Sequence, residues 1–166
     1  MIESLQLSWA IVVRNWTVYR KDFVANISPT VADPSLIMIS LGLGLGPFIQ
    51  EVEGRSYLAF LAPGLLAATA LFTSFFEASY GFYVRMTYES VFKAMLTTPI
   101  GTREVVIGEF IWNFLKGAFM ALGVGIFLLP FGLAPQPLLL PVAAILGGLI
   151  AMPLTGIGLL STTYVK

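Results

Sequence analysis

The polar positions of the chain separate several long apolar stretches, and the longest lies towards the C-terminus. No Asp, Glu, Lys or Arg occurs from position 117 to position 165, a run of 49 residues. A membrane-spanning helix needs about 20 predominantly apolar residues, so this run is too long for one span and suits two. Prolines and a glycine between positions 130 and 137 mark the break, because proline removes a helical hydrogen-bond donor. We therefore predict spans at about residues 107–130 and 138–161.

A third apolar stretch lies between Arg55 and Glu77. Its 21 residues carry no charged side chain, which is long enough to cross a bilayer. With the residues that follow, the stretch predicts a span at about residues 56–79.

A shorter uncharged stretch near Pro34 predicts a further span at about residues 29–49. Two starts for this helix are open. It begins at Pro34 with Asp33 as its N-cap, or it begins near Ser28 and carries a kink at Pro34. Both interpretations put Asp33 near the membrane interface, where its charge is tolerated.

Residues 1–22 have a different pattern, in which large apolar side chains recur at helical spacing, namely Leu5, Trp9, Val12, Val13, Trp16 and Tyr19. Basic residues gather towards the end of the segment, at Arg14, Arg20 and Lys21. Tryptophan beside basic residues on an amphipathic helix is typical of a helix that lies in the membrane interface. The alternative is a soluble tail.

Composition agrees with a membrane protein, since 57% of the 166 residues are hydrophobic, 11% are charged and the mean hydropathy is +0.88. Soluble domains average about a quarter charged residues. The chain has no Cys and no His, which removes thiol nucleophiles, imidazole bases and the usual zinc ligands. No Walker A motif is present. We therefore expect one all-α transmembrane domain over residues 1–166, which is not an enzyme and has no catalytic, metal or cofactor-binding residue.

Lys and Arg are distributed unequally between the two sides that these spans imply. One side receives only Arg55, whereas the other receives Arg14, Arg20, Lys21, Arg85, Lys93, Arg103 and Lys166. Basic residues are enriched in cytoplasmic loops, so we expect the N-terminus and the loop at residues 82–104 to be cytoplasmic. The net charge of zero gives no indication of a nucleic-acid partner.

Within this loop, Thr87–Thr98 has the pattern of a short amphipathic helix that ends at Pro99. One stripe of this helix is aromatic and aliphatic, and comprises Tyr88, Val91, Phe92, Met95 and Leu96. Such a stripe suits a groove on a partner protein. The alternative is that it lies on the bilayer or packs against the spans of the same chain.

Ionisable residues also occur close to the ends of the predicted spans, at Glu77, Arg85, Glu109 and Lys116. Glu109 and Lys116 share one helix face, with Asn113 between them. Charged side chains inside a span are costly and are functional candidates for that reason. The alternative is that these residues mark the cytoplasmic interface, with Lys116 extending its amine towards the headgroups.

Small residues recur one helical turn apart in the last two predicted spans, at Gly117, Ala121 and Gly125 and at Ala144 and Gly148. Small side chains let membrane helices approach closely. We expect these faces to pack together.

The order of several short motifs resembles ABC-2 type transporter permeases. The similar segments are Asp33-Pro34 through Gly46, Tyr57 through Ala67 with Pro63-Gly64, Glu77, Tyr80-Gly81, Arg85, Met95-Leu96, Thr98-Pro99 and Gly108-Glu109. They are most similar to the nodulation-type branch, which exports lipo-oligosaccharide, and drug and polysaccharide exporters are related to it.

The resemblance implies a permease with an interfacial N-terminal helix and six spans, of which this chain holds four. It implies that Thr87–Thr98 is a coupling helix whose docking residues for an ABC ATP-binding subunit are Tyr88, Val91, Phe92, Met95, Leu96, Thr98 and Pro99. That partner would bind ATP and Mg, and a second permease copy would complete the path for a lipid-linked or amphipathic substrate across the inner membrane. The alternative function is a stand-alone membrane scaffold or small channel without a motor.

Overall fold

The computed structural model describes residues 2–49, 51–52, 54–88, 91–133 and 137–164, and it is helical over most of them. Two residues that entered the predictions above lie outside these ranges, namely Lys166 and Pro135, which is one of the prolines in the predicted break between the last two spans. The elements in chain order are α1 (Ile2–Lys21), α2 (Phe23–Gly44), β1 (Glu51–Val52), β2 (Arg55–Ser56), α3 (Tyr57–Phe76), the π-helix η1 (Glu77–Gly81), α4 (Phe82–Thr87), α5 (Val91–Leu96), α6 (Thr102–Leu128), the 3-10 helices η2 (Leu129–Phe131) and η3 (Pro137–Leu139), and α7 (Leu140–Tyr164).

Three helices among the described residues are long and apolar enough to cross a membrane. They are the continuous helix Tyr57–Thr87, the helix Thr102–Phe131 and the helix Leu140–Thr162. The predicted spans at about residues 56–79, 107–130 and 138–161 coincide with them to within two residues at their starts or lie inside them. The chain is therefore an all-α, multi-pass membrane protein, as its composition indicated.

The predicted first span is placed differently by the structure. Its helix, α2, begins at Phe23 and ends at Gly44, so both predicted starts were wrong. Asp33 lies inside the helix, and the N-cap position is Asp22. Phe23 packs edge-on against Tyr19 and Phe119, which anchors the earlier start. The apolar part of α2 is Ser35–Gly44, and a crossing by this helix stays a prediction.

The predicted loop at residues 82–104 is shorter in the structure. The helix that begins with α3 passes through η1 and continues to Thr87, and α6 already begins at Thr102. Phe82, at the start of the predicted loop, is buried in the core. The sequence also predicts Thr87 as the N-cap of the helix Thr87–Thr98. In the structure Thr87 is instead the last residue of α4, and α5 begins only at Val91.

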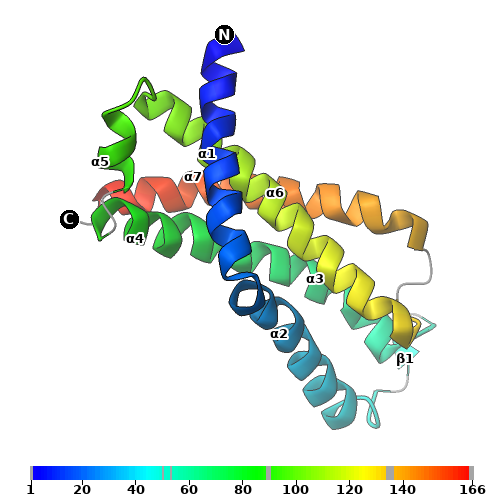
Figure 1. The fold of residues 1–166 in the computed structure, drawn as a ribbon. Helices are drawn as coiled ribbons and strands as arrows, with labels where there is room; N and C mark the ends of the chain where they lie inside the picture. Colours follow the sequence, from blue (N-terminus) through cyan, green and yellow to red (C-terminus); the bar gives the residue numbers. More distant parts are fainter. Residues whose placement is uncertain (1, 50, 53, 89–90, 134–136, 165–166) are drawn as a thin grey trace.

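The helices α3, α6 and α7 pack against one another and form the centre of the molecule (Figure 1). Gly117 of α6 meets Gly147 and Ala151 of α7, where a Cβ added at Gly117 would lie 2.8 Å from the Gly147 carbonyl oxygen. A Cβ added at Gly147 would lie 2.5 Å from the Cβ of Ala121. The close approach expected from the small residues of these spans is therefore confirmed.

The N-terminal segment is helical, as predicted, and α1 crosses over α6 (Figure 1). Its inner face contributes Ile11, Val12 and Tyr19 to the core, whereas Trp9 and Trp16 are exposed. Trp9 and Trp16 therefore remain available for a membrane interface, as expected of an amphipathic helix.

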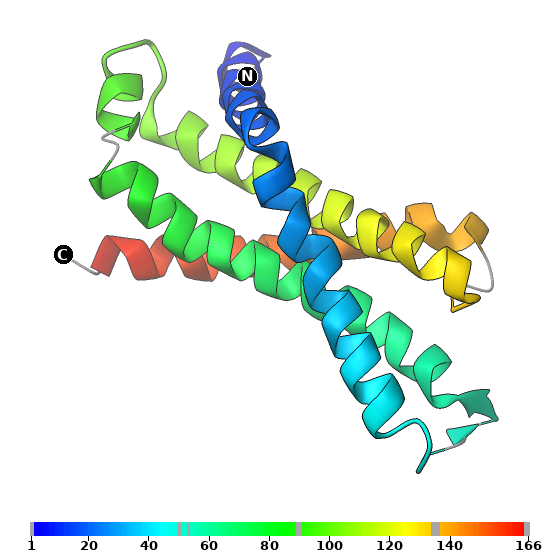
Figure 2. The same cartoon turned by 60° about the horizontal axis from the view of Figure 1, so that its bottom comes forward.

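The two ends of the central bundle carry different structures. The short helix α5 lies at one end, and the hairpin of β1 and β2 lies at the opposite end (Figures 1 and 2). Gly54 makes the hairpin turn with a φ of 72°, a conformation that glycine adopts without strain. In the hairpin, Val52 is opposite Arg55 and Glu51 is opposite Ser56.

Candidate functional site

The structure brings together the ionisable residues that lie near the span ends. Arg85 donates to Glu77 across 2.6 Å and to Glu109 across 2.9 Å. Lys116 donates to the other oxygen of Glu77 across 2.5 Å. The result is a chain of ion pairs in the order Lys116, Glu77, Arg85, Glu109. Glu77 and Arg85 come from one helix, and Glu109 and Lys116 come from α6.

The π-helix η1 explains how Glu77 and Arg85 meet although they are eight positions apart. A π-turn takes up one more residue than a regular α-turn. Two residues that are eight positions apart across a π-turn therefore have the same relative orientation as two residues seven positions apart in an α-helix. Their side chains point in directions that differ by only about 20° around the helix axis. The π-turn therefore stacks the guanidinium of Arg85 over the carboxylate of Glu77.

Glu109 is the most deeply buried member, with 1% of its surface exposed. Besides Arg85, it accepts a hydrogen bond from Nδ2 of Asn15 on α1 at 3.1 Å. Arg14 donates to Oδ1 of Asn15, also at 3.1 Å. Burying a charge is expensive unless it is paired and hydrogen-bonded, and both conditions are met here. The network thereby connects α1 to α6.

A close approach of α1 and α6 makes this contact possible. A Cβ added at Gly108 would lie 2.8 Å from the Cβ of Ile11 and 2.9 Å from the carbonyl oxygen of Ser8. Any larger side chain at Gly108 would push α1 away from α6. The two neighbouring residues therefore have complementary roles. Gly108 allows α1 to approach α6 closely, and Glu109 accepts a hydrogen bond from Asn15 of α1.

Aromatic side chains cover the other end of the network. The amine of Lys116 lies 5.3 Å from the centre of the Tyr19 ring, within the range of a cation–π contact. Nε1 of Trp112 donates to Glu77 at 3.4 Å. Burial, with the nearby charge of Glu77 as a second cause, raises the pKa of Tyr19, so its phenol stays protonated at neutral pH.

Two cavities reach the network from the side of η1. One has a volume of about 240 Å³ and is lined by Arg14 and Arg85 among others. The other has a volume of about 350 Å³ and reaches Asp33 of α2. Both are lined by Glu77 and Lys116. The ion pair between these two residues is therefore accessible from cavities, in contrast to the buried Glu109.

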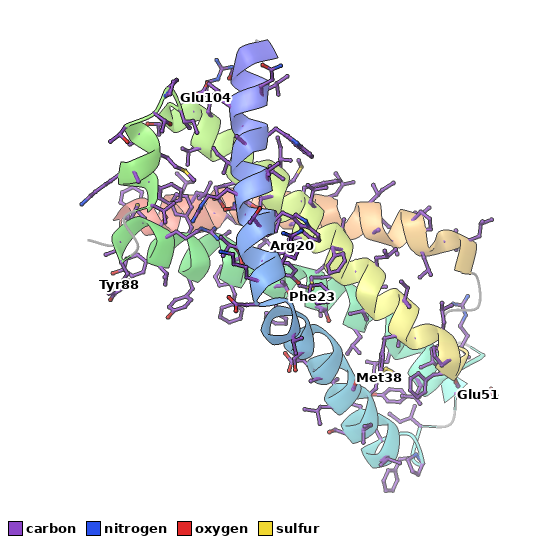
Figure 3. The ribbon with its side chains drawn as sticks, viewed as in Figure 1. Arg20, Phe23, Met38, Glu51, Tyr88 and Glu104 are labelled. Atoms are coloured by element: carbon purple, nitrogen blue, oxygen red, sulfur yellow. The ribbon has the colours of Figure 1, made fainter. Side chains whose placement is uncertain are left out.

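The residues predicted to dock on a partner are divided by the structure into exposed and inward-facing ones. Tyr88 is 74% exposed and Leu96 is 53% exposed, and Thr98 and Pro99 are exposed as well. Figure 3 shows Tyr88 at the end of the molecule opposite Glu51. These residues remain available to a partner.

The remaining residues of the predicted stripe face inwards. Phe92 is only 8% exposed, and its ring centre lies 4.7 Å from that of Phe82. Met95 packs against the same cluster, and Val91 is half-buried. For Phe92 and Met95 the alternative interpretation therefore holds, because Met95 packs against a core of the same chain to which Phe92 belongs together with Ile11, Phe82, Val105 and Leu159. Docking by the exposed residues stays a prediction.

The predicted helix Thr87–Thr98 is also shorter in the structure. The helix α5 covers Val91–Leu96, and residues 89–90 of the predicted helix lie outside the described ranges. Tyr88 is the C-cap residue of α4. After α5, the hydroxyl of Thr98 donates to the carbonyl oxygen of Met95 at 2.6 Å, and Pro99 follows. The helix therefore ends at Leu96, two residues before the predicted end, and a turn leads to Pro99.

Sequence analysis missed Asn15 and Trp112 as members of the network. A signal for Asn15 was present, because it is a polar residue on the same helical face as Ile11 and Tyr19. A signal for Trp112 was present too, because it lies one turn from Glu109 and its indole N–H needs an acceptor when it is buried. Among the residues that the structure describes, no group of three or more Asp and Glu side chains is placed to hold a metal ion.

Comparison with known proteins identifies relatives over most of the chain. Nodulation protein J of Rhizobium leguminosarum bv. viciae is 36% identical over 121 residues, which is 72% of this chain and 47% of that protein. Nodulation protein J of Rhizobium meliloti is 34% identical over 117 residues, which is 70% of this chain and 45% of that protein. The inner membrane transport permease YadH of Escherichia coli is 21% identical over 134 residues, which is 76% of this chain and 52% of that protein.

The chain spans about half the length of the curated relatives that it matches. No protein-family model matches the chain. No solved structure matches it either.

Proposed function

Because the chain belongs to the nodulation-type branch of the ABC-2 transport permeases, we propose that it is a membrane subunit of an ABC exporter. In this proposal, ATP and Mg are bound by a separate ATP-binding subunit. The permease transmits the conformational change that this partner undergoes. The partner docks on α5 and on the residues that flank it.

The observation that carries the proposal is the mechanical connection between α5 and the buried ion pairs. Phe92 of α5 is held against Phe82 of α4, with 4.7 Å between the ring centres. Arg85 lies about one turn after Phe82 in α4, and it binds both Glu77 and Glu109. A displacement of α5 would therefore move Arg85 and the α6 carboxylate that it holds.

The surface that would meet the partner consists of Tyr88, Lys93, Leu96, Thr98 and Pro99, which are exposed around α5. Large apolar side chains with a charge at their edge are suited to a groove on another protein. Phe92 and Met95 support this surface from below and do not contact the partner directly in this proposal.

The orientation, assembly and substrate complete the proposal. The excess of Lys and Arg at the end that holds α5 supports a cytoplasmic position for this end and for the N-terminus. The relative YadH is an inner membrane transport permease, which supports an inner-membrane location for this chain. A second permease copy would pair with this one around the transport path. The substrate would be lipid-linked or amphipathic, of the lipo-oligosaccharide, polysaccharide or drug type.

The experiment is a pull-down of the tagged chain from detergent-solubilised membranes of its host. We expect a stoichiometric partner that carries a Walker A motif. The double variant Tyr88→Glu with Leu96→Glu should lose this partner, since both side chains are exposed and the fold does not depend on them. Phe48→Glu is the matched control, because Phe48 is 85% exposed and follows α2, remote from α5.

Retention of the partner by the double variant would contradict docking on α5. Isolation of the chain alone, or only with copies of itself, would instead favour a membrane scaffold or small channel without a motor.

A further inference from the structure

A cavity of about 770 Å³ lies between α3, α6 and α7 at the end of the bundle that carries the hairpin. Its floor lies at Leu66 of α3 and Gly125 of α6, whereas the buried Ala62 and Leu128 line its side. Its mouth contains the exposed residues Arg55 and Ser56. The volume lies within the range of roughly 300–1,000 Å³ that is usual for ligand pockets.

The depth of the cavity corresponds to one leaflet of a bilayer. It extends from Arg55 of the hairpin to Leu66 of α3. Because α3 begins at Tyr57 and a helix rises by about 1.5 Å per residue, the part along α3 is about 14 Å deep. The hydrocarbon core of a bilayer is about 30 Å thick. A Cβ added at Gly125 would lie 3.7 Å from Leu66 of α3 and 2.6 Å from Leu140 of α7. The three helices therefore close the cavity at this level, near the middle of the membrane.

The chemistry of the lining is that of a hydrocarbon site with one charge at its entrance. All lining residues except Arg55 are uncharged, and most are leucine, alanine, glycine or proline. In the hairpin register, the residue opposite Arg55 is the apolar Val52, whereas Glu51 is opposite Ser56. Arg55 also lies two residues before the apolar helix that begins at Tyr57, so its guanidinium is at the level of the headgroups, where it can meet an anion.

We propose that this cavity binds one acyl chain of an anionic bilayer phospholipid, whose phosphate is bound by Arg55. The closed floor is suited to a resident lipid and unsuited to a path across the membrane. The inference does not depend on the proposed export activity, because it rests on the cavity and on Arg55 alone.

The test uses the full chain, purified in detergent, stripped of lipid and then mixed with equal amounts of phosphatidylglycerol and phosphatidylcholine. Native mass spectrometry counts the lipid molecules that each chain retains. We expect one phosphatidylglycerol per chain to be preferred. Arg55→Gln should reduce the preference for phosphatidylglycerol by about fivefold, which is the effect expected of one basic side chain near a lipid headgroup.

Two further variants separate the cavity from the charge. Ala59→Phe and Ala143→Phe place a ring in the cavity from α3 and from α7, and each should abolish retention of both lipids. Arg103→Gln is the matched charge control, because Arg103 is exposed at the opposite end of α6. It should leave retention unchanged.

Lipid retention that survives both phenylalanine variants, when both remain monodisperse, would overturn the proposal. The same holds if Arg55→Gln and Arg103→Gln have equal effects on the preference for phosphatidylglycerol. The chain could also form a dimer that binds no lipid, and Ala59→Phe could abolish that dimer. This result would assign the cavity to a second copy of the chain and would also overturn the proposal.

Discussion

Phe82 and Phe92 face each other with 4.7 Å between their ring centres, and this contact fastens α5 to the end of the long helix that begins with α3. Both rings are buried, although Phe92 belongs to a helix of only six residues. So short a helix is not stable on its own. Its position therefore depends on this contact and on the cluster around it.

Phe92→Ala should destabilise the protein by about 3–5 kcal/mol, because a buried aromatic ring leaves a cavity when it is removed. Leu96→Ala on the same helix should change stability by no more than about 0.5 kcal/mol, since Leu96 is largely exposed. Thermal unfolding in detergent measures the difference, at roughly 2–4 °C per kcal/mol for a chain of this size. Equal effects of the two variants would contradict the inward position of Phe92.

Arg85→Gln should be among the most damaging single substitutions in the network. It leaves Glu77 and the buried Glu109 without their shared cation, and breaking a buried ion pair costs about 3–5 kcal/mol. The double variant Arg85→Gln with Glu109→Gln should recover part of this loss, because it removes the uncompensated buried charge. Thermal unfolding of the single and double variants forms a mutant cycle, and strict additivity would show that Arg85 and Glu109 do not interact.

Gly117→Val should weaken the packing of α6 on α7. The added side chain would meet the Gly147 carbonyl oxygen and the Cβ of Ala151, and overpacking typically costs about 1–3 kcal/mol. Gly64→Ala is a suitable control, because no atom lies within 4 Å of the Cβ that it would add. This control should be neutral or stabilising by about 0.4–1 kcal/mol in thermal unfolding.

The proposed orientation can be tested with single cysteines, since the chain has none of its own. Tyr88→Cys and Phe48→Cys introduce exposed thiols next to α5 and beyond the end of α2. In intact cells with a permeable outer membrane, a membrane-impermeant maleimide should label only the cysteine at position 48. Labelling of the cysteine at position 88 alone would reverse the orientation, and labelling of both would contradict a crossing between them.

Much of the architecture follows from the amino-acid sequence by itself. The long uncharged runs determine three membrane-spanning helices, because an apolar helix of this length has no stable place in water. The face that contains Gly117 and Ala121 determines where α6 and α7 approach, since only small side chains permit that distance. The short motifs around Pro63-Gly64 and Gly108-Glu109 determine the family resemblance.

Only the tertiary structure decided which side chains these helices bring together. Lys116 shares a helix face with Glu109, yet it pairs with Glu77 on another helix. Asn15 reaches Glu109 from α1, and the π-turn after Phe76 aligns Glu77 with Arg85. The hydropathy of a helix indicates how much of its apolar surface must be buried away from water. It does not specify the partner that covers it, and a buried charge is stabilised by whichever group the packed helices place within hydrogen-bond distance.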